Sequence, residues 1–158
     1  MGRLTRGQEQ MAGYFPMLAD THDRISNREG SLQNLARMLN RYIGPTKQAA
    51  YDPVRYKFEI KSGKDIVPLA GLSSGEKQIV SLFTTLLLSD RTELFVVIDE
   101  PELSLFVLWQ EILIDDIMSI STCVNLMAVT HSPFIYGEKL AFFTRDLSDF
   151  SFKPSPRQ

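Results

Sequence analysis

The distribution of apolar and polar positions predicts a helix in the N-terminal third of the chain. Over residues 31–43 apolar side chains recur on one helical face, at Leu32, Leu35, Leu39 and Ile43. Ser31 can cap this helix, and Gly44-Pro45 ends it. Residues 1–30 are polar, contain glycines and a proline, and show no clear period, so a short helix at most is expected there.

A strict alternation of apolar and charged residues predicts a half-buried strand over residues 54–60. Its apolar positions are Val54, Tyr56, Phe58 and Ile60. The turn signal Ser62-Gly63-Lys64 follows, and residues 65–69 can return as an antiparallel partner. Pro68 indicates that this partner lies at a sheet edge.

The second half of the chain combines helical stripes with short apolar runs. A helix is predicted over residues 73–89, from the apolar stripe Ile79, Leu82, Phe83, Leu86 and Leu87. Ser73 and Glu76 have the spacing of a capping box at its start. Residues 94–98 form an unbroken run rich in β-branched side chains, which is typical of a strand buried on both faces.

A helix over residues 104–118 and a second buried strand over residues 124–130 complete the pattern. The inward positions of that helix are Leu105, Leu108, Trp109, Ile112, Leu113 and Ile117, and Glu111 and Asp115 point outward. Strand, helix and strand of these lengths predict a βαβ unit with a parallel strand pair. A last strand is predicted over residues 140–143. The fold class is therefore α/β: a parallel sheet flanked by helices, with a small antiparallel hairpin.

Composition narrows the classes of function. The 158 residues suffice for one domain with a real core, and 44% hydrophobic with 23% charged residues is ordinary for a globular protein. A net charge of −2 and a pI near 5.7 provide no overall basic field for nucleic acid. The single cysteine, Cys123, excludes an internal disulfide, and no apolar run approaches the roughly 18 residues of a membrane span. A cytoplasmic protein without a membrane segment is expected.

Two adjacent carboxylates, Asp99 and Glu100, follow the apolar run at residues 94–98 directly. Ligands of parallel α/β sheets bind outside the carboxyl ends of the strands. Acids at such a place are costly to desolvate unless a cation or a reacting group uses them. The simpler interpretation is a strand that ends in a solvated acidic turn.

Three motifs in order give the chain a resemblance to a known family. LSSGEKQ at residues 72–78, VVIDEPELSL at residues 96–105 and THS at residues 130–132 resemble the signature, Walker B with D-loop, and switch histidine of ABC-type ATPases. The group concerned contains SMC, DNA-repair and OLD-nuclease proteins, often called AAA-type ATP-binding proteins. The resemblance divides the chain into an N-terminal helical segment, the C-terminal half of an ATPase domain and a polar tail, at residues 1–45, 46–145 and 146–158.

The resemblance implies a role for each motif. Asp99 would hold the Mg²⁺ of Mg-ATP, and Glu100 would orient or activate the attacking water. His131 would contact the γ-phosphate or that water. The signature residues would bind the ATP held by a second ATPase domain; they are Ser73, Ser74, Gly75 and Glu76. Alternatively, Ser73 simply caps its helix, and the two roles compete for one hydroxyl.

Two departures from the family pattern stand out. Many relatives carry a histidine where this chain has Phe106, which puts the D-loop contact across a dimer in doubt. No G-x-x-x-x-G-K-[ST] phosphate loop, or Walker A motif, occurs in the sequence. The glutamine loop that precedes the signature in this family is absent too. The chain therefore looks like the C-terminal half of an ATPase core.

The leading hypothesis is an ATP-binding and ATP-hydrolysing domain that works as a head-to-head dimer and needs a Walker A half for turnover. The motifs imply a DNA-repair, chromosome-maintenance or phage-defence class. Its partners would be a second copy or the missing N-terminal ATPase half, with DNA or a nuclease as possible effectors. A second hypothesis is a non-enzymatic interaction subunit, or a truncated gene product, that keeps the fold and the dimer face. A third, a metal-dependent nuclease built on Asp99 and Glu100, needs further acids at the same edge.

Overall fold

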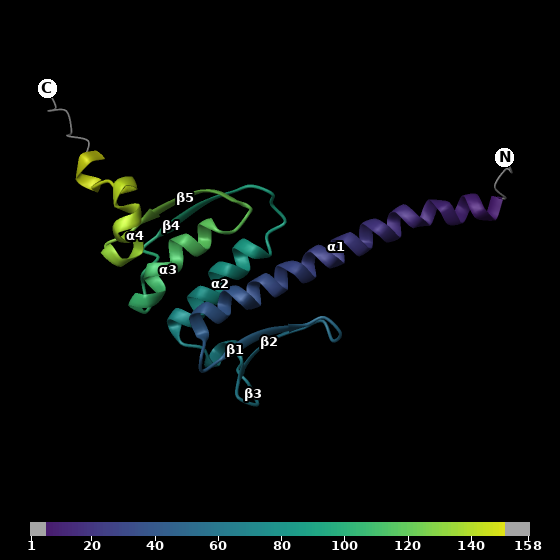
Figure 1. Ribbon diagram of the computed structural model, residues 1–158, viewed down its shortest axis with the longest axis horizontal. Helices are drawn as coiled ribbons and strands as arrows, with labels where there is room; N and C mark the ends of the chain where they lie inside the picture. Colours follow the sequence, from purple (N-terminus) through teal and green to yellow (C-terminus); the bar gives the residue numbers. More distant parts are fainter. Residues whose placement is uncertain (1–5, 151–158) are drawn as a thin grey trace, which may run out of the picture. The chain divides into compact units, whose positions relative to one another are not determined.

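A computed structural model describes the backbone of residues 6–150 and the burial of side chains over residues 19–149 (Figure 1). The chain forms two compact units, residues 1–94 and residues 95–158. The first contains two helices and an antiparallel sheet, and the second contains the strand–helix–strand unit. Of the predicted polar tail, residues 151–158 lie outside the described residues.

Helix α1 spans Arg6–Ile43 and dominates the first unit (Figure 1). The predicted boundary was wrong, because the helix includes most of residues 1–30, and Ser31 lies inside it rather than capping it. Glycine and proline in residues 1–30 suggested irregular structure. Propensity is a weak guide, however, since a helix once nucleated gains a hydrogen bond for every residue added.

The C-terminal part of α1 packs against helix α2 (Ser74–Leu87). The predicted apolar faces are confirmed for both helices: Leu39 of α1 and Ile79 and Phe83 of α2 are fully buried. Tyr42 also belongs to this core, with its ring centroid 5.4 Å from that of Phe83. Burying such large side chains stabilises the unit by roughly 1.5–3 kcal/mol each.

The hairpin sheet consists of β1 (Gln48–Asp52), β2 (Lys57–Ser62) and β3 (Asp65–Ile66), all antiparallel neighbours. The predicted pairing of residues 65–69 with the preceding strand is confirmed for the two residues of β3. Ser62 pairs with Asp65, and Gly63 between them has a φ of 60°, which glycine adopts without steric cost.

The start of the predicted strand at Val54 was wrong. Val54 is 86% exposed and lies in a turn, and Tyr56 in the same turn has a φ of 53°. The Asp52 carboxylate accepts hydrogen bonds from the backbone N–H groups of Val54 and Arg55, at 2.9 and 3.1 Å. This side-chain turn competes with strand pairing, so the alternating pattern is overridden and the chain reverses from β1 into β2.

The second unit contains a parallel pair of strands, β4 (Leu94–Asp99) and β5 (Cys123–Val129), connected by helix α3 (Val107–Met118). The prediction of an α/β fold with a parallel sheet, flanking helices and an antiparallel hairpin is confirmed. Residues Leu113 and Ile117 of α3 are fully buried, and Val96 of β4 is 8% exposed. These apolar side chains form the core of this unit.

Strand β4 is buried on one face only, which corrects the prediction that both faces are covered. Val96 is buried, but Phe95 and Val97 are 63% and 57% exposed. In a strand, alternate side chains point to opposite faces of the sheet. The run is apolar on both faces, yet the described residues cover only the face to which Val96 points.

Helix α3 begins later than predicted, at Val107, after a loop that contains Ser104 with a φ of 65°. Leu108 was predicted to face inward but is 60% exposed. The outward positions Glu111 and Asp115 are exposed, as predicted. The helix is apolar around most of its circumference, so its sequence pattern alone did not distinguish the face that packs.

The last predicted strand, residues 140–143, was wrong. Helix α4 (Pro133–Leu140) is followed by a 3₁₀ turn at Ala141–Phe143, and Phe142 is 80% exposed. Ser132 caps α4 and Pro133 occupies its first turn, which is a favourable start for a helix. No helix among the described residues combines the length and the apolar character that a membrane span requires.

Candidate functional site

The predicted acidic pair lies where β4 ends. Asp99 is the last residue of the strand and is exposed. Glu100 follows with a φ of 45°, a left-handed conformation that non-glycine residues rarely adopt, and its N–H donates to the Val129 carbonyl at 2.7 Å. Pro101 beyond it is fully buried. Backbone strain of this kind, held by packing on one side, is common at functional sites.

The structure brings His131 to the same edge of the sheet. Its Nε2 lies 3.6 Å from Oε1 of Glu100, and the two side chains are 80% and 38% exposed. This distance is too long for a direct hydrogen bond. Both groups are thus adjacent and open to solvent, so a small ligand or a water molecule could contact them together.

A third acid of the same stretch, Glu102, is engaged within the unit. Its Oε2 accepts a hydrogen bond from the Thr130 hydroxyl at 2.6 Å, and its Oε1 accepts from the backbone N–H groups of His131 and Ser132 at 2.8 and 3.1 Å. Desolvation by burial raises the pKa of Glu102, but these hydrogen bonds outweigh it and hold the pKa below its usual value. The carboxylate is therefore the form that the fold stabilises.

Buried Gln110 forms a second connection to this edge. Its side-chain amide donates to the Leu105 carbonyl at 3.0 Å, and its Oε1 accepts from the Ser132 hydroxyl at 2.6 Å. Glu102 and Gln110 thus link the loop after β4 to the residues that follow β5. Sequence reasoning missed both. The only signal was a third acid in DEPE and two hydroxyl residues flanking the histidine.

The signature stretch begins helix α2 in the first unit, and its capping box is present. The Ser73 hydroxyl accepts from the Glu76 N–H at 3.3 Å, and the Glu76 carboxylate accepts from the Ser73 N–H at 2.7 Å. Ser73 and Ser74 are exposed, whereas Gly75 and Glu76 are buried. The long bond to the Ser73 hydroxyl and the exposure of that residue leave it accessible to a ligand.

Lys47 completes this arrangement, which sequence reasoning also missed. Its ammonium group donates to both carboxylate oxygens of Glu76, at 2.7 and 2.8 Å. Desolvation by burial raises the pKa of Glu76, but the bonds from Lys47 and Ser73 prevail and lower it. Glu76 is therefore a structural anion whose acceptor positions are already used, and among the four signature residues it is the least available to a nucleotide.

The residues at the end of β4 fit a metal ion that a nucleotide brings with it. Among the residues that the structure describes, no group of three or more His, Cys, Asp and Glu side chains could hold a metal ion. Mg²⁺ in nucleotide sites usually takes one or two carboxylates and completes its shell with phosphates and waters. Exposed Asp99, with Glu100 beside it, matches that smaller requirement.

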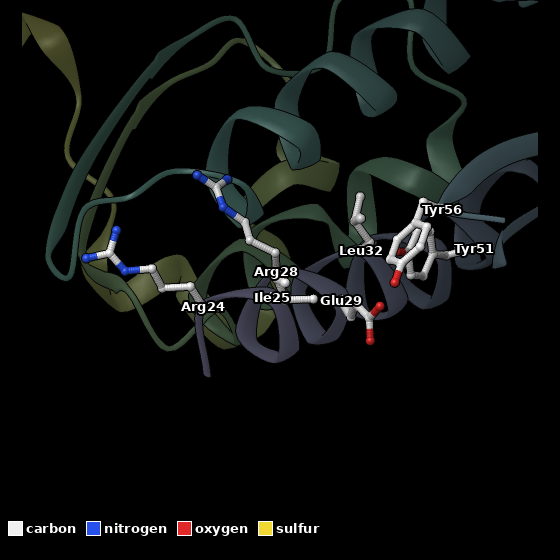
Figure 2. A pocket seen from close by; sticks show the side chains of 7 residues that line it. All are labelled: Arg24, Ile25, Arg28, Glu29, Leu32, Tyr51 and Tyr56. Carbon is white, nitrogen blue, oxygen red and sulfur yellow. The ribbon is translucent and has the colours of Figure 1, made fainter. Parts of the chain in front are cut away.

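The first unit has a shallow hollow on its surface. Figure 2 shows the two tyrosine rings at one end of it and the two arginines at the other. Its lining residues are Arg24, Ile25, Arg28, Glu29, Leu32, Tyr51 and Tyr56. Both arginines are already paired, Arg24 with Asp20 and Arg28 with Asp90. The hollow contains none of the predicted site residues, so the end of β4 remains the candidate site.

Comparison with solved structures agrees with the fold. The chain is similar to the crystal structure of the SmcHead bound to the C-winged helix domain of ScpA, with a TM-score of 0.52 and 18% identity. The match covers 68% of this chain and 36% of that chain, so the protein spans little more than a third of the structure it matches. This likeness concerns the fold: the α/β arrangement of the chain matches the P-loop NTPase-like fold of the SMC head.

The family model described as "AAA domain, putative AbiEii toxin, Type IV TA system" matches residues 9–136, which is most of the chain. The chain therefore belongs to this family of AAA domains. The fold and the family together support a nucleotide-binding, ATPase-like domain. No curated protein matches it significantly.

Proposed function

We propose that this chain is the C-terminal half of a soluble ATPase of the ABC and SMC type, and that it hydrolyses ATP once a Walker A half completes the site. One observation carries the proposal: the Glu100 carboxylate lies 3.6 Å from the His131 imidazole. Glu100 follows Asp99 in the chain, and Asp99 is exposed at the same place. Membership in a family of AAA domains supports the proposal that the ligand is a nucleotide. The motifs LSSGEK and DEPELSL favour DNA repair, chromosome maintenance or phage defence over transport.

Each of the three residues has a separate task in this proposal. Asp99 would hold Mg²⁺, directly or through water, and the chemistry supplied by that ion would be neutralisation of the phosphate charge. Glu100 accepts a hydrogen bond from the attacking water and orients it toward the γ-phosphate. His131 donates a hydrogen bond to the γ-phosphate or to that water. Phosphoryl transfer depends mainly on such positioning and on electrostatic stabilisation.

The signature residues serve a second nucleotide, held by a partner ATPase domain. Ser73 offers an exposed hydroxyl at the N-terminus of α2, where free N–H groups and the helix dipole favour an anion. Gly75 allows the backbone to approach a phosphate closely. Ser74 lies beside them, and Glu76 supports their geometry from its buried pairing with Lys47. A homodimer or a heterodimer of completed domains provides the second site.

The uncovered face of β4 supports a missing half as the other partner. Phe95 and Val97 expose large apolar side chains on one face of a parallel sheet, which is normally covered on both. A segment that carries the phosphate loop and packs on this sheet would cover them. DNA or a nuclease as effector is a further part of the proposal that rests on the motifs alone.

Titration of the purified chain with Mg-ATP tests the incomplete site. Without the backbone amides and lysine of a phosphate loop, four negative charges of ATP meet a site whose own acids repel them. We expect binding in the millimolar range or weaker, roughly −4 kcal/mol, and no hydrolysis. Adding a polypeptide that supplies the Walker A half of this fold should produce both. Micromolar binding with turnover by the chain alone would contradict the proposal.

A non-enzymatic interaction subunit is the alternative that the exposed face of β4 also favours. Such a subunit would bind the same partner through Phe95 and Val97 but would show no turnover in the completed complex. The ATPase assay of that complex, with phosphate release as the readout, therefore separates the two functions.

A further inference from the structure

The carboxylate of Glu102 accepts three hydrogen bonds, all from the segment 130–132 that contains His131. Two donors are the backbone N–H groups of His131 and Ser132, and the third is the Thr130 hydroxyl. Hydrogen bonds to a charged acceptor are shorter and about twice as strong as neutral ones. The carboxylate thereby determines the path of the backbone that carries His131.

We infer that Glu102 is a positioning residue for His131 in the proposed reaction. Glu102 contacts neither the imidazole nor the Glu100 carboxylate through these bonds; it holds the main chain from which the imidazole projects. The histidine itself is 80% exposed, so its own packing can fix it only loosely. A side chain that must act at one position needs such support from the residues behind it. The inference rests on the proposed function of Glu100 and His131.

A purely structural role at the start of α4 does not account for these bonds. Ser132 caps α4 with its own hydroxyl, which accepts from the Phe134 N–H at 3.3 Å. The helix therefore has its cap without Glu102. The carboxylate instead accepts from the N–H groups of residues 131 and 132 and from the Thr130 hydroxyl, all of which precede the first helical residue.

Gln110 provides a second connection between the loop after β4 and segment 130–132. It bridges the Leu105 carbonyl to the Ser132 hydroxyl, so the loop after β4 is tied to segment 130–132 near both of its ends. The outer residues of this loop are exposed, with Leu103 at 57% and Phe106 at 62%. Glu102 and Gln110 thus connect this loop to the segment that carries His131 at two separate points.

Amide hydrogen exchange tests the positioning without any assay of ATP. In the full chain, Glu102→Ala should accelerate exchange at the His131 amide by roughly tenfold or more, and leave the amides of α3 unchanged. The effect at the Ser132 amide should be smaller, because that N–H also donates to the Thr130 hydroxyl at 3.0 Å. Glu102→Gln should give a smaller effect, because its amide oxygen can still accept from both N–H groups. Glu111→Ala, at an exposed position of α3, is the matched control and should change neither amide.

Thr130→Val provides a second variant if Glu102→Ala does not fold. It removes the hydroxyl that donates to Oε2 of Glu102 and keeps the shape of the side chain. The His131 amide should again exchange faster, by a few-fold. The Ser132 amide is not a readout for this variant, because its N–H donates directly to the Thr130 hydroxyl at 3.0 Å. Unchanged exchange in folded Glu102→Ala or Thr130→Val would overturn the inference.

Kinetics of the completed ATPase supply the second arm. Glu102→Ala should lower kcat about tenfold with little change in KM for ATP, and should cause no further loss in a His131→Ala background. An equal loss in both backgrounds would mean that Glu102 acts independently of His131 and would overturn the inference. If the wild-type complex shows no ATPase activity, the proposed function fails, whereas the exchange experiment still decides whether Glu102 holds segment 130–132.

Discussion

Two glutamates of the predicted nucleotide-binding motifs lie in opposite environments. Glu76 in the first unit is 7% exposed and uses its carboxylate oxygens on Lys47 and on the Ser73 N–H. Glu100 in the second unit is 38% exposed in its side chain, follows an exposed aspartate, and has a backbone in the left-handed region. One acid is fully occupied by its own fold, and the other faces solvent.

The difference shows how to distinguish an acid that stabilises the fold from an acid that is available for the reaction, when both lie in motifs of the same family. A carboxylate whose acceptor positions are filled by the protein stabilises the fold, and its removal should appear in the stability. A carboxylate left open at a sheet edge costs the fold little to change, and its removal should appear in turnover. Glu102 is also occupied by the fold, with three hydrogen bonds from segment 130–132, but that segment carries His131, so its removal should appear in turnover as well.

The largest effect is expected at the open acid. Glu100→Gln in the completed ATPase should lower kcat on the order of a hundredfold or more, because it removes the group that orients water, and should leave Mg-ATP binding intact. The melting temperature should change little, since Glu100 is partly exposed. Steady-state kinetics and nucleotide titration measure the two quantities. Hydrolysis at the wild-type rate by this variant would remove Glu100 from the mechanism.

Asp99→Asn serves as the neighbouring comparison. It should shift the Mg²⁺ concentration required for half-maximal activity upward, whereas Glu100→Gln should not, because only Asp99 is proposed to hold the ion. A magnesium titration of both variants distinguishes the two acids. Identical behaviour of the two would show that their tasks are not divided.

At Glu76, whose carboxylate is already bonded within the fold, the expected effect is on stability. Lys47→Met removes the ammonium group from a buried carboxylate and should lower the free energy of unfolding by about 2–3 kcal/mol. Urea denaturation measures it. Lys139→Met is a matched control, because Lys139 pairs with Asp115 at 3.3 Å on an exposed surface and should cost less than about 1 kcal/mol. Equal losses of stability in both variants would show that the buried pair contributes no more than the exposed one.

The lowered pKa of Glu76 predicts that the stability of the chain depends on pH. The pKa of Glu76 is lowered in the folded chain from its usual 4.5, so its contribution to stability is fully present above that value. The contribution is lost as pH falls through the lowered pKa, because protonation breaks the pairing with Lys47. Below about pH 4.5 the wild type should therefore lose stability more steeply than Glu76→Gln. Urea denaturation of both proteins at acidic and neutral pH measures this. If wild type and Glu76→Gln lost the same amount of stability on acidification, the prediction would be wrong.

A smaller effect is expected at Ser73, where structural and functional roles share a hydroxyl. If Ser73 only caps α2, Ser73→Ala should cost about 0.5–2 kcal/mol of stability and leave turnover unchanged. If it also binds phosphate across a dimer, ATP-driven dimerisation should weaken by more than the stability loss explains. Gly75→Asp is the companion variant. Normal melting, dimerisation and hydrolysis in Gly75→Asp would exclude the signature role.

The smallest change in stability is expected on the exposed face of β4. Replacing Phe95 and Val97 by threonine should leave the free energy of unfolding within about 0.5 kcal/mol per site, because both are exposed already and threonine favours strands. Self-association of the isolated chain should decrease, as light scattering can measure, and binding of the Walker A half should weaken. Unchanged scattering and unchanged binding would show that this face is not the contact.

Local patterns predicted the elements of the fold better than their limits. The stripe of α2 and its capping box were correct, because both depend on side chains three or four positions apart. The strand at Val54 and the last strand at residues 140–143 were wrong. In both places a polar side chain, Asp52 or Ser132, binds nearby backbone N–H groups and starts a turn or a helix that apolar patterning does not reveal.

The candidate site was predictable in position but not in its supporting contacts. Two apolar runs that end in Asp99-Glu100 and in Thr130-His131 indicate one sheet edge, since parallel strands bring their carboxyl ends together. The structure indeed has Glu100 beside His131. Which acid of DEPE would remain open could not be read from the sequence, because all three have the same chemistry until the chain folds around them.

By itself, the sequence determined the family, the α/β class, the cap of α2 and the acids at the end of β4, all of which depend on residue type and short spacing. The tertiary structure alone decided that Lys47 neutralises Glu76 and that Glu102 holds segment 130–132. These partners are separated by about 30 positions in the chain, so their meeting depends on the path of intervening helices and strands. It also decided that one face of β4 is uncovered, because burial belongs to the packed arrangement and not to the residues of a strand.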